Sequence, residues 1–143
     1  MPGKQLFISR VKISDKKEGA LNRGDISFVA AKYTPGAPAW TPLASEAFVK
    51  VAKKDLNKWL ACTAYITSPS APLMAGEVIS LVLYEHDNKP QRTWTVDGNK
   101  TLHYDSKESE YGVVTLVYST CVPSQAQTFN LTGASIEIKC VNG

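Results

Sequence analysis

The 143-residue sequence contains no long apolar run, and no segment approaches the roughly 20 apolar residues that a membrane-spanning helix needs. It also lacks the 3.6-residue apolar period of a long amphipathic helix. Charge of one sign is only slightly in excess, with a net charge of +3. Proteins that bind nucleic acid by neutralising phosphates usually carry a stronger positive charge. These absences argue against a helical membrane protein, a helix bundle and a nucleic-acid binder.

The residues of common catalytic sites are scarce as well. The only histidines are His86 and His103, and neither belongs to a spacing that zinc would require. No Gly-x-Ser-x-Gly motif and no glycine-rich phosphate loop are present. Glu85 and Asp87 are a pair of acids, but one residue apart on a strand they lie too close for the arrangements typical of glycoside hydrolysis. We therefore predict that the protein is not an enzyme.

The sequence leaves the compartment of the protein open. MPGKQLFISR, at the amino terminus, has no apolar core before a small-residue cleavage site, so we expect no signal peptide. A cytoplasmic or peripheral membrane location is favoured, and a mature exported domain is the alternative. Three cysteines give an odd count, with Cys62 in an apolar alternation typical of a buried thiol. A Cys121–Cys140 disulfide would fit export, and three reduced thiols would fit the cytosol.

Short alternating apolar segments with turn residues between them recur along the chain, which is typical of an all-β sandwich or barrel. Asp97-Gly98 favours a tight hairpin turn within residues 92–105. A short helix at 42–50 or 53–60 is the one helical alternative. We predict a single domain, residues 1–143, folded as an eight- or nine-stranded antiparallel β-sandwich. The other expected strands are 5–13, 26–34, 46–54, 60–68, 78–85, 111–120 and 134–142.

Three passages between about residues 20 and 92 resemble the C2 domain family. They are ALNRGDISFVAAKYT, similar to a first calcium loop leading into a strand; VKVAKKDLNKW, similar to a lysine-bearing strand and its turn; and ISLVLYEHDNKP, similar to a strand ending in Tyr-Asp-x-Asp. The resemblance implies a C2-like β-sandwich, although periodicity alone fits other Greek-key sandwiches equally well.

The resemblance also implies a calcium site that is incomplete in this chain. Calcium-binding C2 domains present about five carboxylates from loops at one end of the sandwich, as a cation with six to eight oxygen ligands requires. Asp25, Glu85 and Asp87 match three of these positions, and Arg92 stands near a fourth. We expect weak or vestigial calcium binding, with no cofactor required. A polar strand end or a partner contact would explain Glu85 and Asp87 without a metal.

A cluster of lysines is the second candidate site. Lys50, Lys53, Lys54 and Lys58 lie close in sequence with Trp59 beside them. In C2-like sandwiches such a face binds anionic lipid head groups, and each lysine near an anionic membrane contributes about 1 kcal/mol. Lysines on a strand also prevent edge-to-edge pairing, which is the structural alternative. A similar group contains Arg10, Lys12, Lys16 and Lys17.

The sequence thus predicts a non-catalytic binding module that docks on phospholipid head groups or an acidic protein partner through these lysines. The alternative is an exported adhesion or carbohydrate-binding sandwich stabilised by the Cys121–Cys140 disulfide. In that alternative Trp94 and Tyr104, expected to face each other across the hairpin, would stack against a sugar ring. As cross-strand neighbours they would equally stabilise the hairpin itself.

Overall fold

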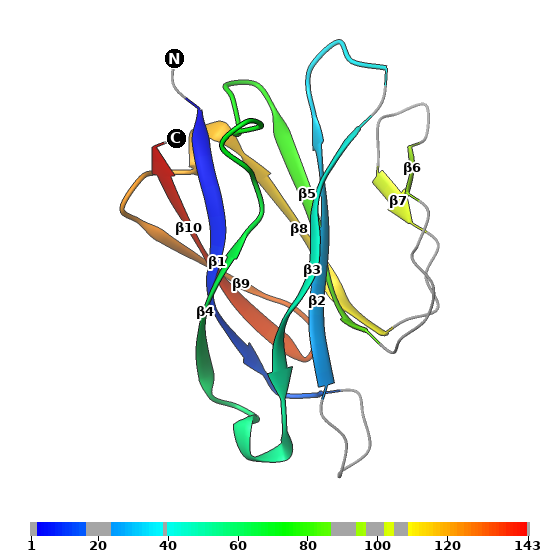
Figure 1. The fold of residues 1–143 in the computed structure, drawn as a ribbon, viewed down its shortest axis with the longest axis vertical. Coiled ribbons are helices and arrows are strands. Elements are labelled where there is room, and N and C mark those ends of the chain that lie inside the picture. Colours follow the sequence, from blue (N-terminus) through cyan, green and yellow to red (C-terminus); the bar gives the residue numbers. More distant parts are fainter. Residues whose placement is uncertain are drawn as a thin grey trace.

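A computed structural model describes residues 3–16, 24–38, 40–86, 94–96, 102–104 and 109–142. Two four-stranded antiparallel sheets pack face to face (Figure 1). In the first sheet the order is β4 (Trp59–Tyr65), β1 (Lys4–Ile13), β10 (Ala134–Asn142) and β9 (Ala126–Asn130). In the second it is β3 (Thr41–Val51), β2 (Gly24–Tyr33), β5 (Val78–His86) and β8 (Ser109–Val117). Strands β6 (Trp94–Val96) and β7 (Leu102–Tyr104) pair with each other in a separate two-stranded sheet.

The predicted antiparallel β-sandwich is confirmed, with two differences in its elements. Of the two ranges considered for a short helix, 42–50 is wrong because it lies in β3, and 53–60 contains the three-residue 3-10 helix η1 (Lys53–Asp55). Pairing with β2 and partial burial of Phe48 override the helix propensity of alanine and lysine in β3. Strand β9 was not predicted, because in AQTFN only Phe129 is a large apolar residue. It is an edge strand in which exposed and half-buried residues alternate.

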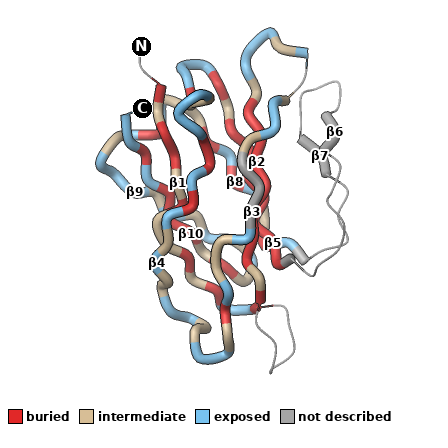
Figure 2. Tube along the Cα trace, in the orientation of Figure 1, coloured by how far each residue is buried: buried red, intermediate tan, exposed pale blue. Residues whose placement is uncertain are grey.

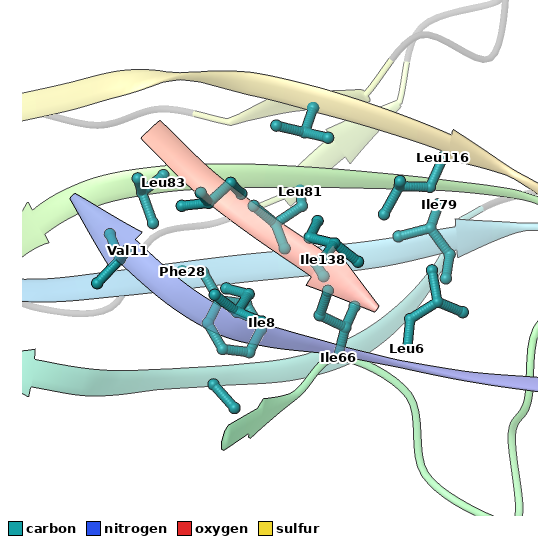
Figure 3. Packing of buried hydrophobic residues seen from close by; sticks show 14 of the residues in the cluster. Leu6, Ile8, Val11, Phe28, Ile66, Ile79, Leu81, Leu83, Leu116 and Ile138 are labelled. Carbon is teal, nitrogen blue, oxygen red and sulfur yellow. The ribbon is translucent and has the colours of Figure 1, made fainter. Parts of the chain in front are cut away.

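The core lies between the two sheets. Apolar side chains on the facing sides of the two sheets point inward and interdigitate (Figure 3). Phe28 from β2 is its largest fully buried side chain. Buried residues follow the facing strands, whereas connections at both ends are largely exposed or half-buried (Figure 2). The aliphatic part of this core includes Leu6, Ile8, Val11, Ile66, Ile79, Leu81, Leu83, Leu116 and Ile138.

A β-bulge in β1 sets which side chains face the solvent. The register with both neighbouring strands shifts between Ile8 and Arg10. Ile8 and Val11 are therefore both buried, although three positions separate them. Beyond the bulge, Arg10 and Lys12 alternate with the buried Val11 and point away from the core.

Among the described residues, no helix is long and apolar enough to span a membrane; the helices found there are η1 and η2 (Tyr118–Thr120).

Candidate functional site

Four exposed lysines gather at one end of the sandwich, which we call the lysine end: Lys50, Lys53, Lys54 and Lys58. Lys50 is near the end of β3, Lys53 and Lys54 form most of η1, and Lys58 directly precedes β4. This connection lies at the lower end of the molecule in Figure 1, opposite the two termini. Within the part of the chain that the structure describes, none of the four makes an ion pair. Residues 50–58 contain one acid, Asp55, and have a net charge of +3.

Local hydrogen bonds fix the shape of the turn that carries these lysines. The Asp55 carboxylate accepts a bond of 3.0 Å from the backbone N–H of Ala52, and the Asp55 N–H donates to the Ala52 carbonyl at 2.9 Å. Asn57 adopts a left-handed conformation with φ of 62°, which asparagine tolerates better than most residues. Its N–H donates to the carbonyl of Ile13 at 2.8 Å. The turn is thereby tied to the end of β1, and its one acid is engaged with the backbone.

Trp59 is a platform for two cations from β1. The Arg10 guanidinium carbon lies 4.3 Å from the centre of the Trp59 ring system, and the Lys12 Nζ lies 5.3 Å from it. Both distances are within the range of cation–π attraction. Arg10 is also paired with Glu137, whose carboxylate accepts from the Arg10 Nε at 2.9 Å. Lys12 therefore adds positive charge beside the lysine end, whereas most of the Arg10 charge is balanced locally.

These residues extend around one edge of the sandwich. Lys50 points outward from the sheet that contains β3, since Val51 beside it is buried. Trp59 and Lys12 are paired across β1 and β4, on the outer face of the other sheet. Lys53, Lys54 and Lys58 lie in the connection between the two sheets. The positive surface thus covers the β3–β4 edge and part of both outer faces.

The second basic group predicted from the sequence does not form one cluster. Arg10 and Lys12 lie over Trp59, whereas Lys16 is buried, with 5% of its surface exposed. Lys17 lies outside the described residues. Strand β1 ends at Ile13, so Lys16 does not continue the outward-facing alternation of Arg10 and Lys12.

The predicted calcium ligands Asp25 and Glu85 come from adjacent strands but point to opposite faces of their sheet. Glu85 is directly opposite Ile26 in the β2–β5 register, so both side chains lie on the inner, buried face. Asp25 precedes Ile26 and is therefore on the outer face, where Lys50 is its cross-strand neighbour on β3. The contact between the two acids is a 3.2 Å hydrogen bond from the Asp25 backbone N–H to Glu85 Oε2.

This arrangement fits a calcium ion poorly. Calcium takes six to eight oxygen ligands, and no group of three or more acid, histidine or cysteine side chains suited to a metal occurs in the described residues. Asp87, the third predicted ligand, lies outside them. Glu85 is 2% exposed and lies close enough to Tyr111 that its charge, after burial and the charge of Asp15, raises the pKa of that phenol. Glu85 is therefore a buried residue at the end of the core where β5 finishes.

The predicted hairpin is present, with Trp94 opposite Tyr104 in the register of β6 and β7. Its expected turn residues, Asp97 and Gly98, lie outside the described part of the chain. The two aromatic residues are thus cross-strand neighbours, as the sequence predicts. Their use as a sugar-stacking platform stays a prediction.

The three cysteines are free thiols in this structure. Cys62 is half-buried, and its sulfur lies 3.5 Å from the Ile8 carbonyl, so burial raises the pKa of this thiol to about 11. Cys121 and Cys140 are buried next to each other at the end that holds the termini. The disulfide between them stays a prediction.

An apolar groove that the sequence does not predict lies at the other end of β3. Its volume is about 720 Å³, and Leu43, Tyr65, Ile66 and Val141 contribute most of its large apolar side chains. No charged residue lines it. Tyr65 is 49% exposed and Val141 is 40% exposed, which is unusual for large apolar residues. This exposure is known only from the structure, so the sequence could not indicate the groove. The groove is not part of the lysine end, because it lies at the opposite end of β3.

Comparisons with known proteins give a distant match in fold. No protein-family model matches the chain, and no curated protein matches its sequence. Among solved structures, a C2 domain of plant extended synaptotagmin 1 is similar over 99% of this chain and 95% of that chain. The sequence identity is 13% and the TM-score is 0.47. The arrangement of the strands themselves shows that the chain is an antiparallel β-sandwich.

Proposed function

We propose that this protein is a non-catalytic module that docks on anionic phospholipid head groups through its lysine end. The observation that supports this most directly is the exposure of Lys50, Lys53, Lys54 and Lys58 without an ion-pair partner among the described residues. Unpaired ammonium groups retain their full charge for an external anion. Lys12, held over Trp59, enlarges the same positive surface.

The rigidity of the turn adds to this proposal. Because Asp55 and Asn57 fix η1 to the ends of β3 and β1, the lysines approach a membrane as a group. Docking then costs the entropy of the lysine side chains and little backbone entropy. Each lysine close to an anionic bilayer contributes about 1 kcal/mol, an effect that falls off within a Debye length. The binding constant should therefore decrease about five-fold for each lysine neutralised.

Trp59 has a different part in docking from the one that its residue type suggests. An interfacial tryptophan inserts its ring among lipid head groups. Here the ring is half-buried and carries Arg10 and Lys12. In this proposal Trp59 positions cations, and the attraction is electrostatic throughout. Calcium is not required, since Asp25 and Glu85 point to opposite faces of their sheet.

The test is sedimentation with vesicles of neutral phosphatidylcholine or of phosphatidylcholine containing phosphatidylserine. We expect retention on the anionic vesicles alone, in the presence of a calcium chelator, with steep loss as salt rises. Replacing all four lysines of the lysine end by glutamine should lower the binding constant by two orders of magnitude or more. Equal retention on both vesicle types would contradict the proposal.

A control variant of equal net charge localises the site. Lys139→Gln, at an exposed position of β10, removes one charge away from the lysine end and is compared with Lys53→Gln. We expect this variant to keep most of the binding. If both variants lose binding equally, net charge rather than the lysine end causes docking. If the anionic vesicles retain nothing while a polyglutamate column retains the wild type, the acidic partner is a protein instead of a lipid.

A further inference from the structure

Two buried thiols adjoin each other at the end of the sandwich that is farthest from the lysine end. Cys121 follows η2, in the connection that leads from β8 in one sheet to β9 in the other. Cys140 is in β10, in the middle of the first sheet. The two residues are 0% and 2% exposed, and their side chains share a hydrogen bond. Both thiols are therefore buried neighbours in the same core cluster, away from solvent.

Backbone hydrogen bonds hold in place both the connection that contains Cys121 and the strand that contains Cys140. The Cys121 N–H donates to the Tyr118 carbonyl at 3.2 Å, which closes η2. The Ser124 N–H donates to the carbonyl of Cys140 at 3.4 Å, so the segment after Cys121 is attached to β10. The Lys4 ammonium donates to the carbonyls of Tyr118 and Cys121, at 2.9 and 2.5 Å, and lies 3.9 Å from the centre of the Tyr118 ring.

The pair is also arranged so that one thiol ionises before the other. The hydrogen bond with Cys140 lowers the pKa of Cys121 against the effect of burial, and the charge of Lys4 lowers it further. The same hydrogen bond, followed by burial, raises the pKa of Cys140. A thiolate hydrogen-bonded by a neighbouring thiol is the arrangement that attacks a disulfide and then resolves it. The third thiol, Cys62, lies on β4 against the Ile8 carbonyl and serves as an internal control.

We propose that Cys121 and Cys140 are a redox-modification site that a low-molecular-weight disulfide, such as oxidised glutathione, converts into a disulfide bond. The Cys121 thiolate attacks one sulfur of the small disulfide, forms a mixed disulfide and releases one thiolate. Cys140 loses its proton and displaces the second thiolate from Cys121. One molecule of the small disulfide is reduced to two thiols, and the two cysteines are oxidised by two electrons.

The bond would join the connection between the sheets to the last strand. It closes a loop of about 20 residues, which restricts the unfolded chain and leaves the native contacts as they are. The oxidised protein should therefore melt about 10 °C above the reduced one. Because both sulfurs are buried in the native state, the small disulfide reaches them during folding or local opening.

The test starts from the reduced, denatured wild-type protein, in which every thiol is accessible, refolded in a glutathione redox buffer. After free thiols are alkylated, trypsin cleaves behind Lys139, between the two cysteines. We expect one disulfide-linked peptide pair that joins Cys121 to Cys140, with Cys62 alkylated. Three alkylated cysteines, or linkages that involve Cys62 in comparable amount, would overturn the proposal.

Two variants and a melting curve complete the experiment. Cys62→Ala should leave the linked peptide pair unchanged, and Cys140→Ala should abolish it. The wild-type peptide map decides the matter even if Cys140→Ala does not fold. A lower melting temperature for the oxidised protein than for the reduced one would also overturn the proposal, because it would mean that the bond strains the native geometry.

Discussion

The two ends of the sandwich contain the same residue type in opposite situations. At the lysine end, four ammonium groups are exposed and have no acid partner among the described residues. At the end with the termini, Lys4 is bonded to two carbonyls and Lys32 is buried against Glu77, with Nζ and Oε1 3.2 Å apart. The difference shows which cations stabilise the fold and which remain available to a ligand. Lysine count alone does not distinguish the two groups.

The Lys32–Glu77 pair belongs to a buried network at the start of β3 and β5. The Lys32 side chain is 11% exposed and that of Glu77 7%. The Glu77 carboxylate also accepts from the Thr34 hydroxyl at 2.5 Å and from the Met74 N–H at 2.8 Å, and Lys32 donates to the Pro72 carbonyl at 3.1 Å. Every charge there has several partners, which is the condition under which a buried ion pair is tolerated.

The largest difference in stability should appear when one lysine at each end is replaced by alanine and the two variants are compared. Lys32→Ala leaves the buried Glu77 carboxylate without its counter-charge and should cost about 3–5 kcal/mol of unfolding free energy. Lys53→Ala removes an exposed charge and should change stability by less than about 0.5 kcal/mol. Urea denaturation measures both values. Vesicle binding should respond in the opposite way, with about a five-fold loss for Lys53→Ala and none for folded Lys32→Ala. Equal stability losses would contradict the contrast between the two ends.

The fold was more predictable from the sequence than the site. Alternating apolar residues identify β1, β2, β5 and β10, because burial on one face of a strand imposes a two-residue period. Strand β9 escaped because Phe129 is its only large apolar residue, which leaves too little alternation to detect. Strand order carries no such signal, since it depends on contacts between distant segments.

Site residues depend on which face a strand presents, and here the sequence succeeds only in part. The exposed lysines of residues 50–58 follow from their positions in a strand end and a turn. The pairing of Lys12 with Trp59 could not be foreseen, because it requires the register of β1 against β4. Asp25 and Glu85 looked like one acidic site, but the register of β2 and β5 separates their side chains. Register is thus the information that the sequence lacks.

A smaller loss of stability should appear when the solution is acidified and Glu77 of the buried Lys32–Glu77 pair is protonated. Although burial opposes it, hydrogen bonds from Thr34, Met74 and Lys32 hold the pKa of Glu77 below its ordinary value. The unfolded chain therefore binds a proton more readily at this residue, and the network contributes full stability above the unfolded pKa. That contribution is lost as pH falls through the folded pKa.

Comparison with Glu77→Gln isolates this contribution from that of other carboxyl groups. The difference in unfolding free energy between wild type and variant should shrink as the solution is acidified from pH 7 to pH 3. The loss on acidification should be smaller than that in Lys32→Ala, because a protonated carboxyl keeps its shape and some of its hydrogen bonds. A difference that stays constant with pH would mean that the pKa of Glu77 is the same in the folded and the unfolded protein.

The smallest effect, a change in melting temperature, is expected from calcium. It tests whether the acids Asp25, Glu85 and Asp87 form a binding site as the lysines of the lysine end do. A ligand that binds the native protein at 100 times its dissociation constant adds about 2.7 kcal/mol of stability. With Asp25 and Glu85 on opposite faces of the sheet, millimolar calcium should raise the melting temperature by less than about 2 °C. Magnesium at equal concentration controls for ionic strength. A larger, calcium-specific shift that Asp87→Asn removes would mean that Asp87 completes a cation site at the lysine end, where Asp25 is the cross-strand neighbour of Lys50.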